Sequence, residues 1–395
     1  MKINIKLMPL VVGAGAFMAL SLALLTGHNA FAATKTWTGA TDPWFSTPSN
    51  WSPAGVPANG DDLVFDDNQL TGAAESPIIA EPNAPVVASI TFIAKDMGDG
   101  STSCPKLYAA NGIVITKAIT VSNSNCVPGL TGGYLLGGDV TISSNSINLG
   151  FSDGALDLNG HTLNVSDAYF AEDFLITGQG TINISDNSAF IGHKTYSGTT
   201  NIKWDAGGSP LGVIAGNADA FGTSTINVLG TASIYWSIPI ANTVISITNP
   251  INLYSKSILP QVSMFFGGAY SNSTGLTKLA VPNITLHGNT SLAAQGVMVD
   301  LGGIKSNGFC LDYYIGSGAN MKNAILDQAS DTGFTNGPAQ CVAKKNTVGT
   351  PNTGAEQTKD KVSLAASLAP FAAIITVAVT GFAIYRQTMN RKIKL

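Results

Sequence analysis

Apolar residues recur two positions apart through the middle of the chain, and turn-forming Gly, Asn, Ser and Thr flank them. Because side chains of a β-strand alternate between its two faces, this pattern predicts short strands with one buried face. The anchors of these strands are Ile142, Leu163 with Val165, Ile182 with Ile184, Ile226 with Val228, Ile251 with Leu253, and Ile284 with Leu286. The region is therefore predicted to be all-β.

The spacing of the anchors indicates how the strands are arranged. Their first members are 21, 19, 44, 25 and 33 residues apart, where 44 fits two units of 22 and 33 indicates an insertion. A period near 20 residues with one strand per repeat predicts a right-handed parallel β-helix, or solenoid. Tandem β-sandwiches are the alternative, since they also contain short, regularly spaced strands. Recurrent Asn and Gly beside the anchors favour the solenoid, whose corners need residues that tolerate left-handed geometry.

Both ends of the chain have the pattern of targeting segments. Residues 1–32 combine two lysines, an apolar run and Ala30-Phe31-Ala32. They predict a secretory signal peptide cut between Ala32 and Ala33, and a retained anchor helix is the alternative. The uncharged run 362–385 is long enough for one transmembrane helix, and the basic tail 386–395 is expected to stay cytoplasmic. The bulk of the chain is then expected outside the cell.

Between these ends the sequence predicts an N-terminal cap over 33–85, the β-solenoid over 86–300, and a C-terminal cap and stalk over 301–349. Four cysteines fall in this exported part, and an even number in an oxidising compartment favours disulfides. Proximity favours one pair before the solenoid anchors and one after them, among three possible connectivities. The pairs are Cys104 with Cys126 and Cys310 with Cys341. Thiol catalysis is the alternative, but no histidine lies near these cysteines in the sequence.

Charge narrows the possible functions. Residues 33–353 contain 12 lysines, no arginine and 22 acidic residues, which gives a formal charge of −10. Nucleic-acid binding is not expected, because attachment to phosphates depends on clustered Lys and Arg. We expect no cofactor and no metal site, although two groups of residues leave metals open. Asp61, Asp62, Asp66 and Asp67 form either a Ca²⁺ cluster or a charged strand edge, and His161, His193 and His287 bind zinc only if the coils align them.

Two further groups could act on carbohydrate. Trp37, Trp44 and Trp51 lie seven residues apart and form either a sugar-stacking platform or packing inside the N-terminal cap. Hydrolysis of a glycan requires two facing carboxylates, and the sequence offers Asp153 with Asp157 and Glu172 with Asp173. Enzymatic activity is not expected, because only an analogy with other β-helices supports it.

The segment before the apolar run resembles a sortase cell-wall sorting signal. Thr350, Pro351, Asn352, Thr353 and Gly354 match the family pattern LPXTG at its Pro, Thr and Gly, with Thr350 in place of Leu. A polar spacer, an apolar span and a basic tail follow in the order typical of that signal. The resemblance implies cleavage between Thr353 and Gly354 by a sortase-type transpeptidase and attachment to peptidoglycan. The alternative is a plain linker before a membrane anchor.

Two stretches resemble autotransporter-associated β-strand repeat proteins. Residues 34–65 contain Trp37 and Gly39, then Trp44, Asn50 and Trp51, then Pro57, Gly60 and Asp61, which is similar to the opening of those proteins. Residues 195–234 resemble the repeat itself, through Tyr196, Gly198, Thr200, Ile202, Ala220, Gly222, Ile226 and Val228. The resemblance implies an extended parallel β-helix used as a surface passenger.

Together these features predict an adhesin or surface-layer structural protein that is displayed on a bacterial cell surface, with a host-surface or carbohydrate ligand. A surface-anchored carbohydrate-active enzyme is the alternative.

Overall fold

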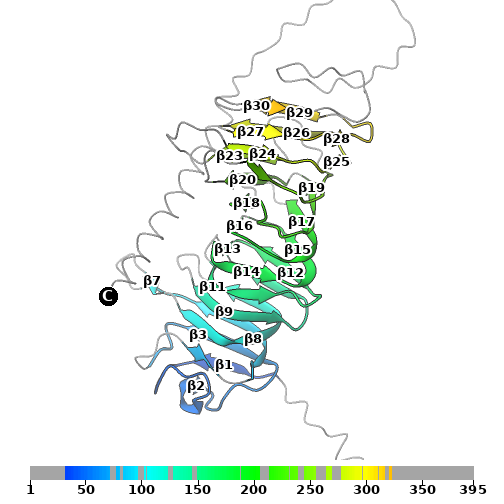
Figure 1. The fold of residues 1–395 in the computed structure, drawn as a ribbon. Coiled ribbons are helices and arrows are strands. Elements are labelled where there is room, and N and C mark those ends of the chain that lie inside the picture. Colours follow the sequence, from blue (N-terminus) through cyan, green and yellow to red (C-terminus); the bar gives the residue numbers. More distant parts are fainter. Residues whose placement is uncertain are drawn as a thin grey trace, which may run out of the picture. The chain divides into compact units, whose positions relative to one another are not determined.

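A computed structural model describes residues 32–322, with gaps at 72–76, 81–82, 97–101, 104, 123–127, 145–148, 187, 205–212, 231, 239–243, 255–263, 269–276, 296, 310 and 316–319. These residues form short strands joined by turns, with one 3-10 helix at Pro48–Asn50 (Figure 1). Contacts within the chain define two units, Met1–Thr200 with Asp219–Ser224, and Asn201–Ala218 with Thr225–Leu395.

The strands of the first unit run from β1 to β16. They are β1 (Thr34–Trp37), β2 (Trp51–Ser52), β3 (Asp61–Asp66), β4 (Ile78–Ile79), β5 (Val86–Ile93), β6 (Lys95–Asp96), β7 (Thr102–Ser103), β8 (Lys106–Val121), β9 (Gly129–Leu136), β10 (Val140–Ser143), β11 (Leu149–Asp157), β12 (Thr162–Ser166), β13 (Ala168–Phe170), β14 (Phe174–Thr177), β15 (Gln179–Ile184) and β16 (Ala189–Phe190). The boundary between the units falls within β17 (Ser197–Trp204).

The strands of the second unit are shorter on average. They are β18 (Val213–Ala215), β19 (Thr225–Gly230), β20 (Ile234–Ile238), β21 (Val244–Ser246), β22 (Ile251–Leu253), β23 (Met264–Gly268), β24 (Thr277–Ala280), β25 (Ile284–Leu286), β26 (Thr290–Gln295), β27 (Val297–Asp300), β28 (Ile304–Lys305), β29 (Leu311–Ile315) and β30 (Asn320–Lys322).

In the first unit, strands from successive turns of the chain pair in parallel. β1 pairs with β3 and β3 with β5, while β8, β10, β12 and β15 continue the same ladder. The predicted anchors lie directly beside one another, since Ile142 faces Val165 and Val165 faces Ile184. The predicted parallel β-solenoid is therefore confirmed, and the alternative of tandem β-sandwiches is wrong, because sandwich strands would pair mainly antiparallel.

The second unit repeats this arrangement. Ile226 pairs with Ile251, Ile251 with Ile284, and Ile284 with Ile304, all in parallel register. The spacing of 33 residues between Ile251 and Ile284 is therefore one coil with an insertion, as the sequence predicts. Parallel strands need long crossover connections, which the rest of each coil provides.

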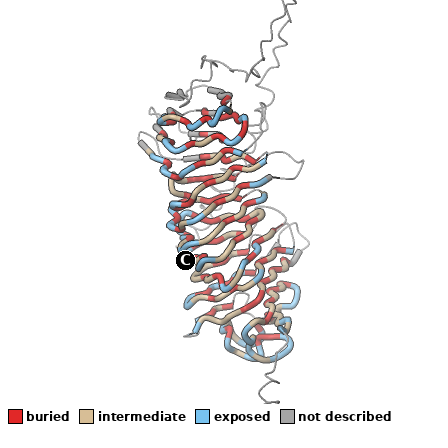
Figure 2. The backbone as a smooth tube through the Cα atoms, turned by 90° about the vertical axis from the view of Figure 1, so that its right-hand side faces the viewer, coloured by how far each residue is buried: buried red, intermediate tan, exposed pale blue. Residues whose placement is uncertain are grey.

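The core of each unit is filled by the inward residues of these strands. In Figure 2, buried residues alternate with intermediate and exposed ones along the coils. The first unit contains a column of stacked rings in which Phe151, Phe170 and Phe190 follow one another with centroids 4.8 Å apart, and Phe221 lies 5.5 Å beyond. Equivalent positions of successive coils lie side by side, so one phenylalanine per coil forms a continuous column of rings in the interior.

Close approach of neighbouring coils demands glycine at one corner. A Cβ added to Gly154 would lie 1.9 Å from the carbonyl oxygen of Gly132, which itself has φ +95°. β11 has a bulge at this point, where its register with β9 shifts between Ser152 and Gly154. The extra residue, Asp153, takes a φ of 50° and lies exposed at the bulge.

Candidate functional site

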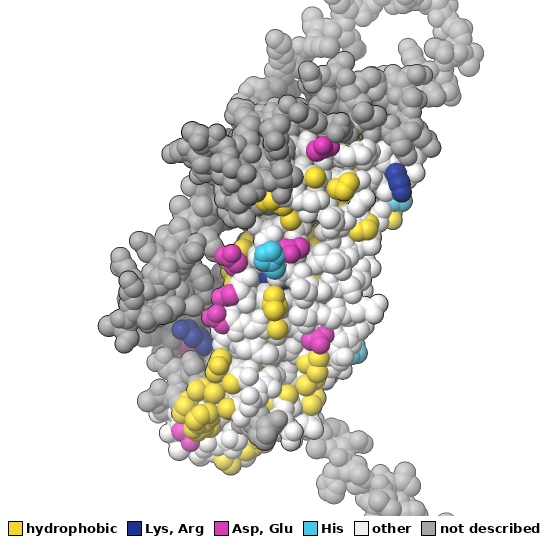
Figure 3. All heavy atoms as spheres, viewed as in Figure 1, with side chains coloured by type: hydrophobic (Ala, Val, Ile, Leu, Met, Phe, Trp, Pro, Cys, Tyr) yellow, Lys and Arg dark blue, Asp and Glu magenta, His cyan; other side chains and the backbone are white. Residues whose placement is uncertain are grey.

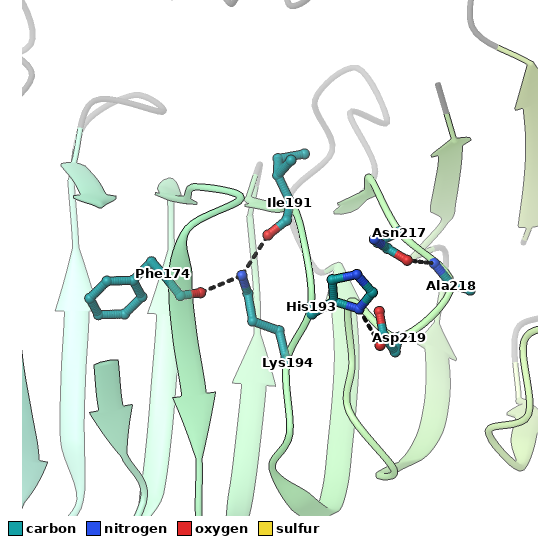
Figure 4. Close-up of polar contacts among 7 residues, drawn as sticks. All are labelled: Phe174, Ile191, His193, Lys194, Asn217, Ala218 and Asp219. Atoms are coloured by element: carbon teal, nitrogen blue, oxygen red, sulfur yellow. Dashed lines mark hydrogen bonds and ion pairs between the residues drawn. The ribbon is translucent and has the colours of Figure 1, made fainter. Parts of the chain in front are cut away.

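A buried lysine, Lys194, lies near three carboxylates in the first unit. The backbone from Gly192 to Tyr196 alternates between buried and exposed residues, so Lys194 points inward although it carries a charge. Its Nζ donates a hydrogen bond to the carbonyl oxygen of Ala171 at 3.0 Å. It donates two more to the carbonyl oxygens of Phe174, at 2.6 Å, and Ile191 (Figure 4). Only 2% of the residue is exposed.

Burial shifts the protonation of this lysine. Desolvation lowers the pKa of Lys194 to about 8, and the nearby carboxylates of Asp173, Asp219 and Glu172 oppose that shift. The three carbonyl acceptors satisfy all three hydrogens of the ammonium group, which is the arrangement a buried cation requires. Lys194 therefore joins the turn that contains Ala171 and Phe174 to its own segment of the next coil while it carries its charge.

Acidic side chains and a histidine lie close to Lys194 on the surface of the first unit. The Nδ1 atom of His193 lies 2.6 Å from Oδ2 of Asp219, and the side chain of His193 is largely accessible to solvent while that of Asp219 is partly buried. Figure 3 shows a histidine and several acidic side chains close together on this face, and Figure 4 shows that His193 points away from Lys194. The other carboxylate oxygen of Asp219, Oδ1, is buried and accepts no hydrogen bond among the described residues. We call His193, Lys194, Asp219, Glu172, Asp173 and Asp153 the acidic corner.

The carboxyl group of Asp173 raises the pKa of Asp153 in the acidic corner. The hydrogen bond between the side chains of Asp153 and Asp173 is the main cause that raises the pKa of Asp153, and desolvation and charge repulsion add to it. The bulge in β11 brings Asp153 to this position, and the turn between β13 and β14 supplies Asp173. Two carboxylates in contact cannot both ionise freely, so one holds a proton to higher pH.

This contact bears on the predicted hydrolytic pairs. Hydrolysis of a glycosidic bond requires carboxyl groups about 5–9.5 Å apart, so that a sugar or a water fits between them. Asp153 is hydrogen-bonded to Asp173, rather than paired with Asp157 as the sequence suggested, and this direct contact leaves no room for a substrate. Glu172 and Asp173 are neighbours in one turn. The acidic corner can hold protons and attract cations, but its known geometry does not match that of a hydrolase.

Amide ladders cover the outward face of the main sheet. In the first unit, Asn183 donates to the side-chain oxygen of Asn164 at 2.9 Å. In the second unit, Asn227 donates to Asn201 and Asn252 donates to Asn227, each at 2.9 Å. The coils that carry these asparagines thereby present an amide at the same place, and hydrogen bonds between neighbouring amides hold the side chains in fixed orientation.

The other predicted metal-binding residues are separated by the fold. Asp61 is buried and accepts hydrogen bonds from the backbone N–H of Ala33 and of Ala58, each at 2.8 Å. Asp62 accepts one from Ser89, and Asp66 accepts two from Asn68, through its backbone N–H and its side-chain amide. Within the part of the chain that the structure describes, no three His, Cys, Asp or Glu side chains come close enough to hold a metal ion.

The three histidines lie on different coils, each with its own partner. His161 is 4.0 Å from Asp139, His193 contacts Asp219, and His287 stacks on Tyr254 with ring centroids 4.2 Å apart. The three histidines therefore form no common cluster among the described residues.

Two of the three tryptophans pack inside the N-terminal coils, and the third is exposed as a sugar-stacking residue would be. Trp37 and Trp51 are buried and meet edge to face with centroids 5.1 Å apart, and Trp51 also meets Phe45 at 5.0 Å. These two form the interior of the N-terminal coils. Trp44, in contrast, is 47% exposed.

Several predicted sites lie outside the described residues. These are the sorting motif 350–354, the apolar run 362–385, the basic tail 386–395, and Cys104, Cys126, Cys310 and Cys341. Of the predicted cleavage site, Ala32 is exposed, and the carbonyl of Ala33 accepts the first ladder hydrogen bond, from Asp62. Among the helices of the described ranges, none has the length and hydropathy that a membrane crossing requires.

Comparison of the chain with protein-family models, with curated proteins and with solved structures finds no match. The resemblance to autotransporter-associated repeats therefore has support at the level of the fold alone, which is a parallel β-solenoid.

Proposed function

We propose that the protein is a surface-displayed β-solenoid, exported by its signal peptide and attached through its C-terminal segment, that serves in adhesion or as a structural element of the cell surface. The amide ladders are the observation that carries this proposal. They hold a row of outward-facing amides in fixed orientation on two adjacent coils of the first unit and three of the second, which suits a surface that is presented to partners.

Three further features support display outside a cell. The part of the chain between the two end segments is acidic and lacks arginine, which disfavours nucleic acid as a partner. A solenoid gains length by adding coils, which suits a protein that must present a binding surface at a distance from its anchor. The order of motif, spacer, apolar run and basic tail at residues 350–395 matches that of a sorting signal, with a sortase-type transpeptidase and peptidoglycan as the implied partners.

The test uses the full chain expressed in a Gram-positive bacterium that carries a sortase. The wild-type protein is expected in the wall fraction, released by a muramidase but not by detergent. A Thr353→Ala variant removes the residue whose carboxyl group would be transferred, and it is expected to stay in the membrane fraction. An Asn352→Ala variant is the matched control, because that position is variable in the motif. Equal detergent release of all three proteins would contradict the covalent anchor.

The alternative is a surface-anchored carbohydrate-active enzyme, and the raised pKa of Asp153 beside Asp173 is the feature that favours it. An Asp153→Asn variant would then abolish release of reducing sugars from polysaccharide substrates. The direct contact between the two carboxyl groups makes this the weaker of the two proposals.

A further inference from the structure

The exposed Trp44 belongs to a row of apolar side chains on the N-terminal coils. Trp44 forms an isolated parallel bridge with Ile78, and Ile78 pairs in parallel register with Tyr108. Their chain neighbours Phe45, Ile79 and Leu107 point into the core. Because side chains alternate along a strand, the row itself faces outward. We call Trp44, Ile78 and Tyr108 the aromatic strip.

The aromatic strip is open to solvent. Trp44 and Tyr108 are each 47% exposed, which is the highest value among the large apolar side chains that the structure describes. Ile78 lies between them and is half-buried. Apolar side chains also gather over the N-terminal coils in Figure 3. Nothing in the packing of the coils requires two large rings at outward positions, since the interior is already filled by Trp37, Trp51 and Phe45.

One negatively charged and one positively charged side chain border the aromatic strip. Asp42 accepts hydrogen bonds from the backbone N–H of Trp44 at 2.9 Å and from Thr47 and Asn50. Desolvation raises the pKa of Asp42, but these three hydrogen bonds outweigh it, so the pKa lies below its usual value and the group is anionic. At the other end, the exposed Lys106 precedes Tyr108 by two positions on the same face of β8. One charge of each sign favours a ligand without net charge.

The size of the strip argues against a protein partner. A half-exposed aromatic side chain offers on the order of 100 Å², so the three residues together offer roughly 250 Å². A stable protein interface needs about 800 Å² from each partner. A second copy of the chain, or another folded protein, would therefore find too little apolar surface here.

We propose that the aromatic strip binds an extended, neutral, β-1,4-linked polysaccharide that runs along the stacked coils. The C–H groups on the flat face of a pyranose ring carry partial positive charge and pack against the electron-rich face of an indole or phenol ring. The inference deepens the proposed adhesive function by naming the class of ligand, and it rests on that function.

The spacing of the rings favours an extended chain over a coiled one. Neighbouring coils are about 4.8 Å apart, so Trp44 and Tyr108, two coils apart, are separated by about 9.6 Å along the stack. That distance is close to the disaccharide repeat of a β-1,4-linked chain, in which every second sugar presents the same face. Each ring can therefore meet an equivalent sugar, while Ile78 lies under the sugar between them. A helical α-1,4-linked polymer offers no such repeat.

The experiment measures depletion of the full chain, kept in detergent, by insoluble cellulose, chitin and starch and by calcium polygalacturonate, which is anionic. Binding to cellulose or chitin is expected, with little binding to starch or polygalacturonate. Trp44→Ala and Tyr108→Ala are each expected to weaken that binding about three- to tenfold, which corresponds to the loss of one stacked ring. Trp44→Phe and Tyr108→Phe keep a ring and are expected to retain most of it.

Tyr254→Ala is the matched control, because Tyr254 is 41% exposed but stacks on His287 in the other unit. It is expected to bind like the wild type, and far-ultraviolet circular dichroism with thermal unfolding verifies that every variant is folded. The proposal is overturned if neither cellulose nor chitin is bound, if the alanine variants bind as well as the wild type, or if Tyr254→Ala is equally weakened. Wall attachment without polysaccharide binding would refute this inference alone, whereas binding without wall attachment would refute the covalent anchor alone.

Discussion

Replacement of Lys194 by methionine is predicted to change how the stability of the protein depends on pH. Methionine keeps an unbranched side chain in the interior but has no proton to lose and donates no hydrogen bond. In the wild type, burial lowers the pKa of Lys194 from 10.5 in the unfolded chain to about 8 in the folded protein. Between these two values the unfolded chain binds more protons than the folded protein, so this group stabilises the folded state increasingly as the pH rises.

The size of the effect follows from the two pKa values. The difference between 10.5 and about 8 is about 2.5 units, and at about 1.36 kcal/mol per unit it amounts to about 3 kcal/mol. The wild type is therefore expected to gain about 3 kcal/mol in unfolding free energy relative to Lys194→Met as the pH rises from 7.5 to 11. Below pH 7.5 the difference between the two proteins is expected to be constant.

Urea unfolding followed by circular dichroism at several pH values measures this difference. Lys194→Arg is the informative second variant, because arginine keeps the cationic donors for the carbonyl oxygens of Ala171 and Phe174 but does not titrate in this range. The unfolding free energy of the wild type is expected to rise relative to that of Lys194→Arg by the same amount and over the same pH range. A difference between wild type and Lys194→Met that stays flat from pH 7 to 11 would refute the account of Lys194.

Three further substitutions test individual contacts. Desolvation and the charge of Asp186 raise the pKa of Asp167 to about 6. The folded protein therefore loses stability as the pH rises through that value and Asp167 ionises. Asp167→Asn is expected to raise the free energy of unfolding by about 1 kcal/mol at pH 7, after a discount for solvent screening, and to leave it unchanged below pH 4. Asp61→Asn is expected to lower the free energy of unfolding by about 2 kcal/mol in a chain that begins at Ala33. In that chain the α-ammonium group of Ala33 takes the place of the backbone N–H that now donates to Asp61, so the substitution removes a charged partner. In the unprocessed chain the loss is expected to be smaller. Asn227→Ala removes two ladder hydrogen bonds and is expected to cost about 1–2 kcal/mol. Thermal unfolding with van't Hoff analysis measures all three, and changes of the opposite sign would contradict the assignments.

The repeating part of the fold was predictable because one simple rule governs it. Apolar pairs two residues apart recur once per coil, and the structure places Val165 beside Ile184 and Ile251 beside Ile284. Even the irregular spacing before Ile284 corresponds to a single coil, since added residues can leave a solenoid as a loop without disturbing the register.

The contents of the acidic corner were not predictable from the sequence alone. Alternation around Tyr196 is a signal that Lys194 points inward, but two of its three acceptors, Ala171 and Phe174, lie on the preceding coil. The contact between Asp153 and Asp173 depends on a bulge that shifts the register by one residue, and sequence spacing does not reveal a bulge.

The positions of the three tryptophans, inside or outside the core, were also not predictable from their spacing in the sequence. Their regular spacing predicted a common role, but Trp37 and Trp51 belong to paired strands of the first coil, whereas Trp44 lies in the connection between them and faces solvent. Whether a ring is inside or outside is decided by the parity of its position in a strand. That parity becomes visible only when the strand partners, such as Ile78 for Trp44, are known.

The central claim is that the chain is displayed on the cell surface through its C-terminal segment, and mass spectrometry of the C-terminal peptide tests it most directly. Protein released from purified cell walls by a muramidase is digested, and the peptide that contains Thr350 is sequenced. The account predicts a peptide that ends at Thr353 and carries a peptidoglycan fragment on its carboxyl group. A peptide that continues through Gly354 into residues 362–385 would contradict the covalent attachment and leave the apolar run as the only anchor.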